Sequence, residues 1–207
     1  MSEKAFNSWE EFLNPDKFKL ALIQASIYLT SYEIFKNSTM EKLKDFFTDR
    51  WNLNEETGEL EGTPNKDCKK KVLDLNPKDE FQACCLWFKN MSALDDNDLM
   101  NIAVVRKHRN QIAHELPKFL SGQGKLVNLE NLNTVIKLES KISKWWLREV
   151  ELPTNPDVDE EYINNTNWDN VLGGNTILHN LLSSIFNGDD SYLRELHQQF
   201  ISNWRNR

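Results

Sequence analysis

Apolar residues recur at helical spacing over most of the chain. Between residues 15 and 35 they trace one stripe and then spread around the helix, a pattern typical of a helix buried on more than one side. Asn14 and Pro15 are a favourable N-cap and first helical residue. We therefore expect a long first helix over 15–35, covered by other helices of the chain or by a second subunit.

Further helices follow from capping and periodicity. Ser38 and Glu41 match a capping box and predict a short helix that ends near residue 47. The segment 50–76 holds Gly58, Gly62 and Pro64 but few periodic apolar positions, so we expect an irregular excursion there. Pro117 is expected to end the helix that precedes it. The remaining helices are predicted over 76–91, 95–117, 128–150, 168–187 and 190–204.

These elements predict an all-α protein, since no run of residues alternates as a strand would and no repeat has a fixed period. Residues 1–150 are expected to form an antiparallel helical bundle of four to five helices, with the excursion at 50–76. Residues 151–167 are rich in proline and acidic residues and are interpreted as a linker or loop. Residues 168–207 are expected to form a C-terminal helical hairpin.

Composition narrows the class of protein. Of the 207 residues, 39% are hydrophobic and 28% are charged, as is usual for soluble globular proteins. No apolar run is long enough to span a membrane, and the N-terminus lacks the pattern of a signal peptide. The three cysteines suggest buried free thiols rather than a disulfide framework or a zinc site. We therefore expect a cytoplasmic protein.

The net charge of −7 argues against a broadly basic nucleic-acid surface. Positive charge is local, and one such place is the stretch RKHRNQIAHELPKF at 106–119. At about 100° per residue, Val105, Ile112 and Leu116 share one apolar sector. Arg109 falls inside that sector, whereas Asn110 and His114 lie together at its edge. His108 is expected to point away, toward solvent.

An arginine on a buried face has three explanations. Its guanidinium can reach out to solvent along its apolar stem, or it can form a salt bridge, for which Glu33 in the first helix is the candidate. Alternatively, Arg109, Asn110 and His114 line a polar cleft. Such a cleft would combine an anion-binding group with a proton-transfer group, a pair suited to phosphate chemistry.

Other chemistries find less support. His114-Glu115 begins like an HExxH zinc motif, but Lys118 stands where the second histidine is required. His179 and His197 each occur alone in helical patterns and are interpreted as ordinary core or surface residues. The sequence therefore predicts neither a metal nor a cofactor.

The residues Arg109-Asn110-Gln111-Ile112-Ala113-His114 resemble the R-x(4–6)-H motif of HEPN domains. The resemblance covers roughly residues 15–150. It implies a helical bundle that forms a homodimer, with two motifs meeting in one composite cleft. Many HEPN domains are metal-independent endoribonucleases that act as toxins or in phage defence. By this resemblance, Arg109, Asn110 and His114 would be catalytic, with Glu33 and Arg106 in support.

Roles and products follow from the same resemblance. His114 would transfer protons during attack by the RNA 2′-hydroxyl, Arg109 would stabilise the phosphoryl oxygens, and Asn110 would orient these groups. Glu33 would position Arg109. The products would be 2′,3′-cyclic phosphate and 5′-hydroxyl ends, and DNA, which lacks the nucleophile, would not be cleaved.

Partners and alternatives are also implied. An antitoxin or regulatory protein would control the nuclease. The tyrosine motif that often follows the histidine in such toxins is missing from Glu115-Leu116-Pro117-Lys118-Phe119, so control by tyrosine modification is not expected. One alternative is a non-catalytic HEPN module that binds a nucleotide, RNA or a protein partner. Another is a helical scaffold in which Arg109 has a structural pairing.

Overall fold

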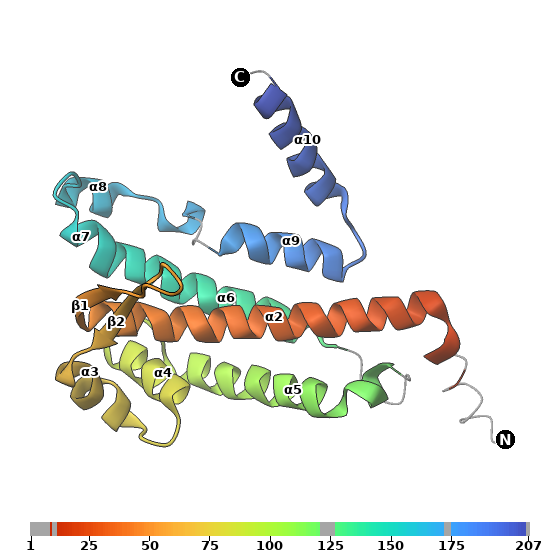
Figure 1. Ribbon diagram of the computed structural model, residues 1–207, viewed down its shortest axis with the longest axis horizontal. Coiled ribbons are helices and arrows are strands. Elements are labelled where there is room, and N and C mark those ends of the chain that lie inside the picture. The colour runs from red at the N-terminus through yellow and green to blue at the C-terminus, as the bar shows by residue number, and fades with distance from the viewer. Residues whose placement is uncertain (1–8, 10–11, 121–126, 172–174, 206–207) are drawn as a thin grey trace. The chain divides into compact units, whose positions relative to one another are not determined.

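The computed structural model describes residue 9 and residues 12–120, 127–171 and 175–205 (Figure 1). Helices dominate, and the only strands in this part of the chain form one two-stranded antiparallel sheet, so the predicted all-α class is confirmed. The residues divide into two compact units. One draws on Met1–Tyr32, Val104–Ile136 and Gly174–Arg207, and the other on Glu33–Ala103 and Lys137–Gly173.

The longest helix, α2, spans Pro15–Phe46 without a break, so the predicted division near residue 36 is wrong. Asn14 caps its start by accepting hydrogen bonds from the backbone N–H groups of Asp16 and Lys17, each at 3.1 Å. Ser38 does not cap a second helix. Its hydroxyl and that of Thr39 donate to the Phe35 carbonyl instead, at 3.2 and 2.7 Å. Back-bonding of this kind lets the helix continue.

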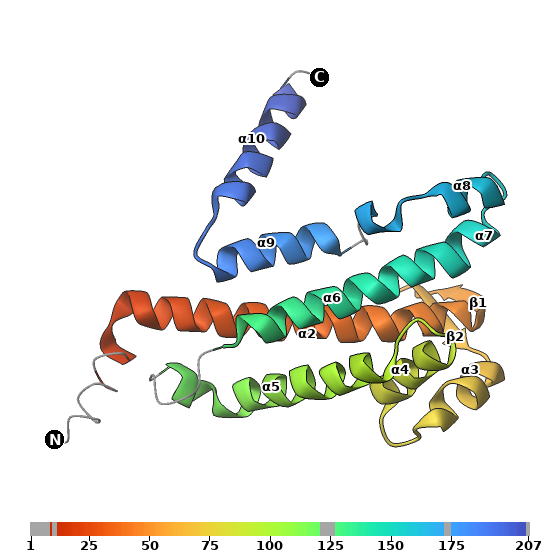
Figure 2. The same ribbon diagram turned by 180° about the vertical axis from the view of Figure 1, so that it is seen from behind.

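The first unit combines the first half of α2, the second half of α5 (Asp96–Leu120), the start of α6 (Leu129–Trp146), α9 (Thr176–Phe186) and α10 (Ser191–Arg205). In this unit the parts of α2, α5 and α6 run side by side in both views (Figures 1 and 2). Its core contains Ala25, Tyr28, Ile112, Leu132 and Phe186.

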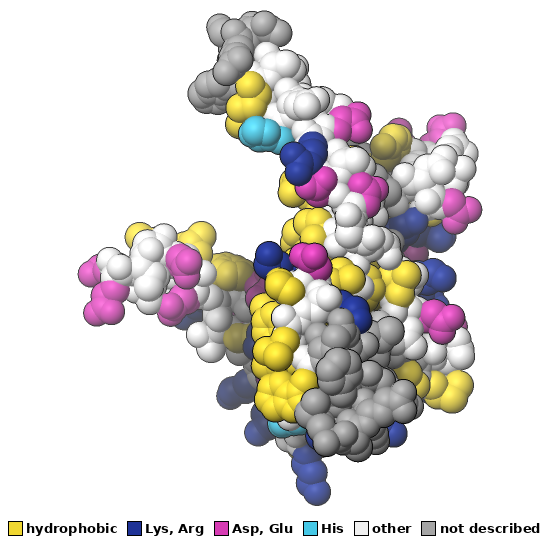
Figure 3. Space-filling model, turned by 90° about the vertical axis from the view of Figure 1, so that its right-hand side faces the viewer, with side chains coloured by type: hydrophobic (Ala, Val, Ile, Leu, Met, Phe, Trp, Pro, Cys, Tyr) yellow, Lys and Arg dark blue, Asp and Glu magenta, His cyan; other side chains and the backbone are white. Residues whose placement is uncertain are grey.

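Two observations on this unit differ from expectation. Helices α9 and α10 diverge from the turn between them instead of forming a closed hairpin (Figures 1 and 2), and most described side chains of α10 are exposed. On α2, Leu20, Leu22 and Ile23 are exposed in the single chain, although we expected burial around that helix. Figure 3 shows hydrophobic side chains, in yellow, on the face of the molecule that it draws.

The second unit holds the segment that was expected to be irregular. Strands β1 (Thr48–Leu53) and β2 (Leu60–Pro64) form a hairpin in which Trp51 pairs with Gly62. A side chain at Gly62 would clash, because its Cβ would lie 2.6 Å from the Thr48 methyl. Helix α3 (Lys66–Lys71) and the short 3₁₀ helix η1 (Leu73–Leu75) follow.

The rest of this unit is helical. Helix α4 (Glu80–Asn90) is capped by Asp79, which accepts from the Gln82 N–H at 3.1 Å, and the ring of Phe35 packs against Phe81. Helix α6 continues into a π-helix, η2 (Leu147–Glu151). The predicted linker 151–167 contains ordered turns of helix, namely α7 (Leu152–Thr154) and α8 (Glu160–Asn165), before the 3₁₀ helix η3 (Trp168–Asn170).

The cysteine prediction is confirmed, since Cys68, Cys84 and Cys85 are all buried and free. Burial raises the pKa of the Cys84 thiol to about 12, which keeps it protonated and unreactive at neutral pH. Within the described residues, no helix has the length and apolar character needed to cross a membrane.

Candidate functional site

The predicted site lies on the second half of α5, and the start of that helix is firmly anchored. The side chain of Asp95 accepts from the N–H of Asp98, and that of Asp98 accepts from the N–H of Asp95, both at 2.9 Å. This reciprocal cap satisfies two donors that the helix itself cannot. Lys141 of α6 then pairs with both carboxylates.

The other end of α5 departs from the prediction. The helix does not end at Pro117 but bends at Glu115, whose φ and ψ are −115° and 20°, and resumes to Leu120. Proline has no N–H, and its ring collides with the carbonyl four residues earlier, so the backbone deforms just before it, at Glu115. His114 is therefore the last residue before the bend.

Arg109 is half-buried, and an aromatic ring covers it. Its guanidinium carbon lies 5.9 Å from the centre of the Tyr32 ring, within the range of a cation–π contact. Its Nη1 donates to Asn110 Oδ1 at 3.3 Å. The aromatic partner and the neighbouring amide together limit how far the guanidinium can turn, although Tyr32 was not recognised as its partner from the sequence.

Asn110 and His114 are exposed, and Arg106 is half-buried. Residues four apart share a helix face, so Arg106, Asn110 and His114 form a row, and Arg109 lies beside it. In the single chain Asn110 and His114 of this row are open to solvent. The structure thus brings Arg109 and Asn110 into contact and places His114 one turn further along the same face.

Glu33 belongs to the second unit, whereas Arg109 belongs to the first. It is half-buried, and its carboxylate forms an ion pair with Lys36 at 3.6 Å, three residues later on α2. Its predicted role in positioning Arg109 stays a prediction.

His108 lies on the opposite side of α5 from the expected one. Instead of facing solvent it is buried, with its ring 4.8 Å from that of Tyr28 and 6.4 Å from that of Phe119. Its Nε2 accepts from the backbone N–H of Asn128 at 3.1 Å, so that nitrogen carries no proton. Burial lowers the pKa of His108, against a hydrogen bond with Gln111 that raises it.

The spacing of residues on α5 could have predicted that His108 is buried. It follows Val105 by three residues and precedes Ile112 by four, and both of these are fully buried. The two histidines of this helix therefore differ in kind. His108 is a packing residue that joins α5 to the first residue before α6, whereas His114 is exposed to solvent.

The charges around the row favour an anion. Arg106, Lys107 and Arg109 lie within one turn, and the nearest described carboxylate along the helix, that of Glu115, pairs with Lys118 at 3.3 Å. No group of three or more His, Cys, Asp or Glu side chains in the described part of the chain is placed to hold a metal ion. His179 is buried and His197 is exposed, in line with their interpretation as core and surface residues.

No family model matches the chain, and neither a curated protein nor a solved structure matches it.

Proposed function

We propose that this chain is a metal-independent endoribonuclease of the HEPN type. The observation that carries the proposal is the row on α5, where Asn110 and His114 are exposed on one face and Arg109 is held beside them by Tyr32 and Asn110. A cation, an amide and a histidine at these positions can act together on a single phosphodiester. The exposed row is also accessible to a polymer.

The chemistry assigned to each residue is simple. The RNA 2′-oxygen attacks phosphorus as its proton is taken up, the P–O5′ bond breaks, and the leaving 5′-oxygen receives a proton. His114 takes part in one of these proton transfers. Arg109 neutralises the phosphoryl oxygens as negative charge develops on them. Asn110 holds either Arg109 or the RNA backbone in position, and Arg106 adds positive charge one turn earlier.

The reaction needs both a base and an acid, and His114 is the one exposed histidine of the row. A homodimer supplies two copies of the row. Exposed Leu20 and Ile23 on α2, in the same unit, support this arrangement, because a second subunit would cover them. A composite cleft between two copies would exclude water and hold RNA between paired histidines.

The main alternative is a non-catalytic HEPN module that binds a nucleotide, RNA or a protein partner. The same exposed groups support it, since they could hold a phosphate without transferring a proton. A toxin or phage-defence role, under control of an antitoxin or regulatory protein, belongs to the nuclease proposal.

The test is to incubate purified protein with total RNA in EDTA, beside Arg109→Ala, His114→Ala and His197→Ala variants. His197 is the matched control, because it is an exposed histidine on α10. We expect cyclic phosphate and 5′-hydroxyl ends from wild type and from His197→Ala. Loss of His114 should slow cleavage by at least about 100-fold. An oligonucleotide with one 2′-deoxy position should resist cleavage there.

Three outcomes would count against the nuclease. Cleavage that stops in EDTA would contradict the assignment of charge stabilisation to Arg109. Equal loss in His114→Ala and His197→Ala would show that the row is not the site. RNA binding without cleavage by a folded dimer would favour the binding module.

A further inference from the structure

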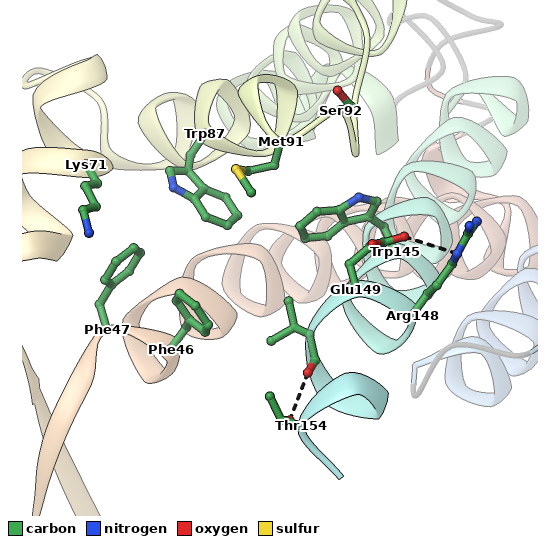
Figure 4. Close-up of a pocket in the computed structure, with 11 residues that line it drawn as sticks. Phe46, Phe47, Lys71, Trp87, Met91, Ser92, Trp145, Arg148, Glu149 and Thr154 are labelled. Carbon is green, nitrogen blue, oxygen red and sulfur yellow. Dashed lines mark hydrogen bonds and ion pairs between the residues drawn. The ribbon is translucent and has the colours of Figure 1, made fainter. Parts of the chain in front are cut away.

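The second unit contains a cleft of about 830 Å³, to which no residue of α5 contributes (Figure 4). Its lining comes from the end of α2, from α3, from the end of α4 and from α6, η2 and α7. The volume lies within the range of small-molecule sites in proteins.

Aromatic rings form the wall of this cleft, and Figure 4 shows four of them around the same space. The rings are linked edge to face, with centroid distances of 5.1 Å for Phe46 and Phe47, 6.3 Å for Phe47 and Trp87, and 6.2 Å for Trp87 and Trp145. Each ring therefore holds the next in place, and the wall is formed before any ligand arrives.

The wall is also open to solvent. Phe46 is 52% exposed and Met91 is 47% exposed, so a large apolar area faces water in the single chain. A flat apolar molecule would remove that area from water with little rearrangement of the protein.

Among the residues that line the cleft, two are cationic, Lys71 and Arg148, and one is anionic, Glu149. Arg148 and Glu149, both from the π-helix η2, pair with each other at 3.2 Å, and the Arg148 guanidinium also lies 5.9 Å from the Trp168 ring centre. That pair is neutral as a unit. Lys71 is the remaining charged group of the lining, and its ammonium lies 6.0 Å from the centre of the Phe47 ring.

Lys71 already has a carboxylate partner, which lies outside the lining, so a ligand must compete for its ammonium. Its ammonium pairs with Asp67 at 2.6 Å, but both side chains are more than half exposed, and exposed pairs of this kind contribute little. A ligand carboxylate at the edge of the cleft could compete for the same ammonium. Both tryptophans of the wall add indole N–H groups, which can only donate.

From these observations we infer that the cleft binds a small planar aromatic carboxylate. Its ring packs against Phe46, Trp87 and Trp145, and its carboxylate faces Lys71. The inference does not depend on the proposed nuclease, because the cleft and the α5 row lie in different units.

The experiment measures binding of three probes to the full chain by calorimetry and ligand-observed NMR. The probes are 2-naphthoate, the 2-naphthylmethylammonium cation and cyclohexanecarboxylate. We expect 2-naphthoate to bind about tenfold more tightly than either of the others. The ammonium probe keeps the ring and reverses the charge, whereas the cyclohexane probe keeps the charge and removes the π face.

Two pairs of variants locate the site. Phe46→Ala should weaken 2-naphthoate binding about tenfold, whereas Trp51→Ala, which removes an aromatic side chain of similar exposure outside the cleft, should not. Lys71→Gln should weaken 2-naphthoate binding about threefold. The control is Lys70→Gln, at the exposed residue next to Lys71, which should leave the affinity unchanged. Circular dichroism confirms that each variant is folded.

Equal affinity for the naphthoate and ammonium probes would overturn the inference, since the cleft would then be apolar surface without preference for an acid. Equal effects of Phe46→Ala and Trp51→Ala would also overturn it, because binding would lie elsewhere. If RNA cleavage fails while 2-naphthoate binds as described, the nuclease proposal falls and this one stands.

Discussion

His108 and His114 lie six residues apart on α5, yet one serves the fold and the other faces solvent. The imidazole of His108 is enclosed by aromatic rings and accepts a backbone hydrogen bond from Asn128. Protonation of Nε2 would replace that bond with two opposed donors in a buried space. Protonation of His108 is therefore expected to destabilise the folded state of the first unit.

We predict that the free energy of unfolding falls as the pH is lowered from about 7.5 to about 5.5. Burial holds the pKa of His108 below the ordinary histidine value of about 6.5, so as the pH falls the unfolded chain binds this proton first. Lowering the pH therefore stabilises the unfolded state, which binds the proton, more than it stabilises the folded state. The stability contributed by neutral His108 is complete above the unfolded pKa and is lost as the pH falls toward the folded pKa.

The measurement is urea unfolding at several pH values for wild type and for His108→Gln, whose amide oxygen can still accept from Asn128. The variant loses ring packing at every pH, so the slope with pH is the informative quantity rather than the absolute stability. A slope in His108→Gln as steep as in wild type would show that another group is responsible.

At the scale of elements, α2 shows why a local signal can mislead. Ser38 and Glu41 fit a capping box, but the Ser38 hydroxyl bonds to the Phe35 carbonyl and the helix continues. Buried side chains lie on both sides of the predicted break, among them Phe35 and Leu43. Packing along the whole length therefore outweighs the preference of two polar residues.

We predict that Ser38→Ala changes the free energy of unfolding by no more than about 0.5 kcal/mol, since alanine suits a helix interior. Asp79→Ala is the matched comparison, because Asp79 is a true N-cap with its side chain on the Gln82 N–H. That variant should lose about 1 kcal/mol. Chemical denaturation of both variants decides the matter, and a larger loss for Ser38→Ala would argue for two helices.

The same scale shows what periodicity can and cannot predict. Helix α6 was predicted close to its position, whereas α9 begins at Thr176, later than the predicted start at residue 168. The β1–β2 hairpin was missed because its strands are almost wholly exposed and so carry no alternation of apolar and polar residues. The only hint of the hairpin in the sequence was Gly58, which ends the turn between the strands with a φ of +72°.

The site was predictable in part for similar reasons. Spacing along one helix places Asn110 and His114 on a common face, and the structure agrees. The aromatic cover of Arg109 depends on Tyr32, which is distant in sequence. No helical wheel of α5 alone could have found it.

At the scale of the whole molecule, a net charge of −7 must be reconciled with a proposed RNA substrate. The chain cannot attract RNA over its whole surface, so binding rests on a few cations. In the row and directly beside it these are Arg106, Lys107 and Arg109. Each phosphate neutralised on a single strand releases bound counterions and adds about 0.7 to the dependence of affinity on salt.

The salt dependence of RNA affinity therefore indicates whether one row or two rows contact RNA. With three cations per row, the slope of log affinity against log salt should be about −2 for one copy and about −4 for two. We predict the steeper value, because the proposed cleft is composite. Fluorescence anisotropy with a short single-stranded RNA and the His114→Ala variant measures binding without cleavage.

Two further substitutions, each made in the His114→Ala variant, test whether the contacts with RNA lie on α5. Lys107 is exposed next to Arg106, so Lys107→Gln should reduce the magnitude of the slope by about 1.4 if two copies contribute and by about 0.7 if one does. Lys70 lies on α3 in the other unit, and Lys70→Gln should leave the slope unchanged. A slope near −2 that Lys107→Gln lowers by about 0.7 would mean that a single row binds RNA and that the composite cleft is wrong. No response to Lys107→Gln would place RNA binding away from α5.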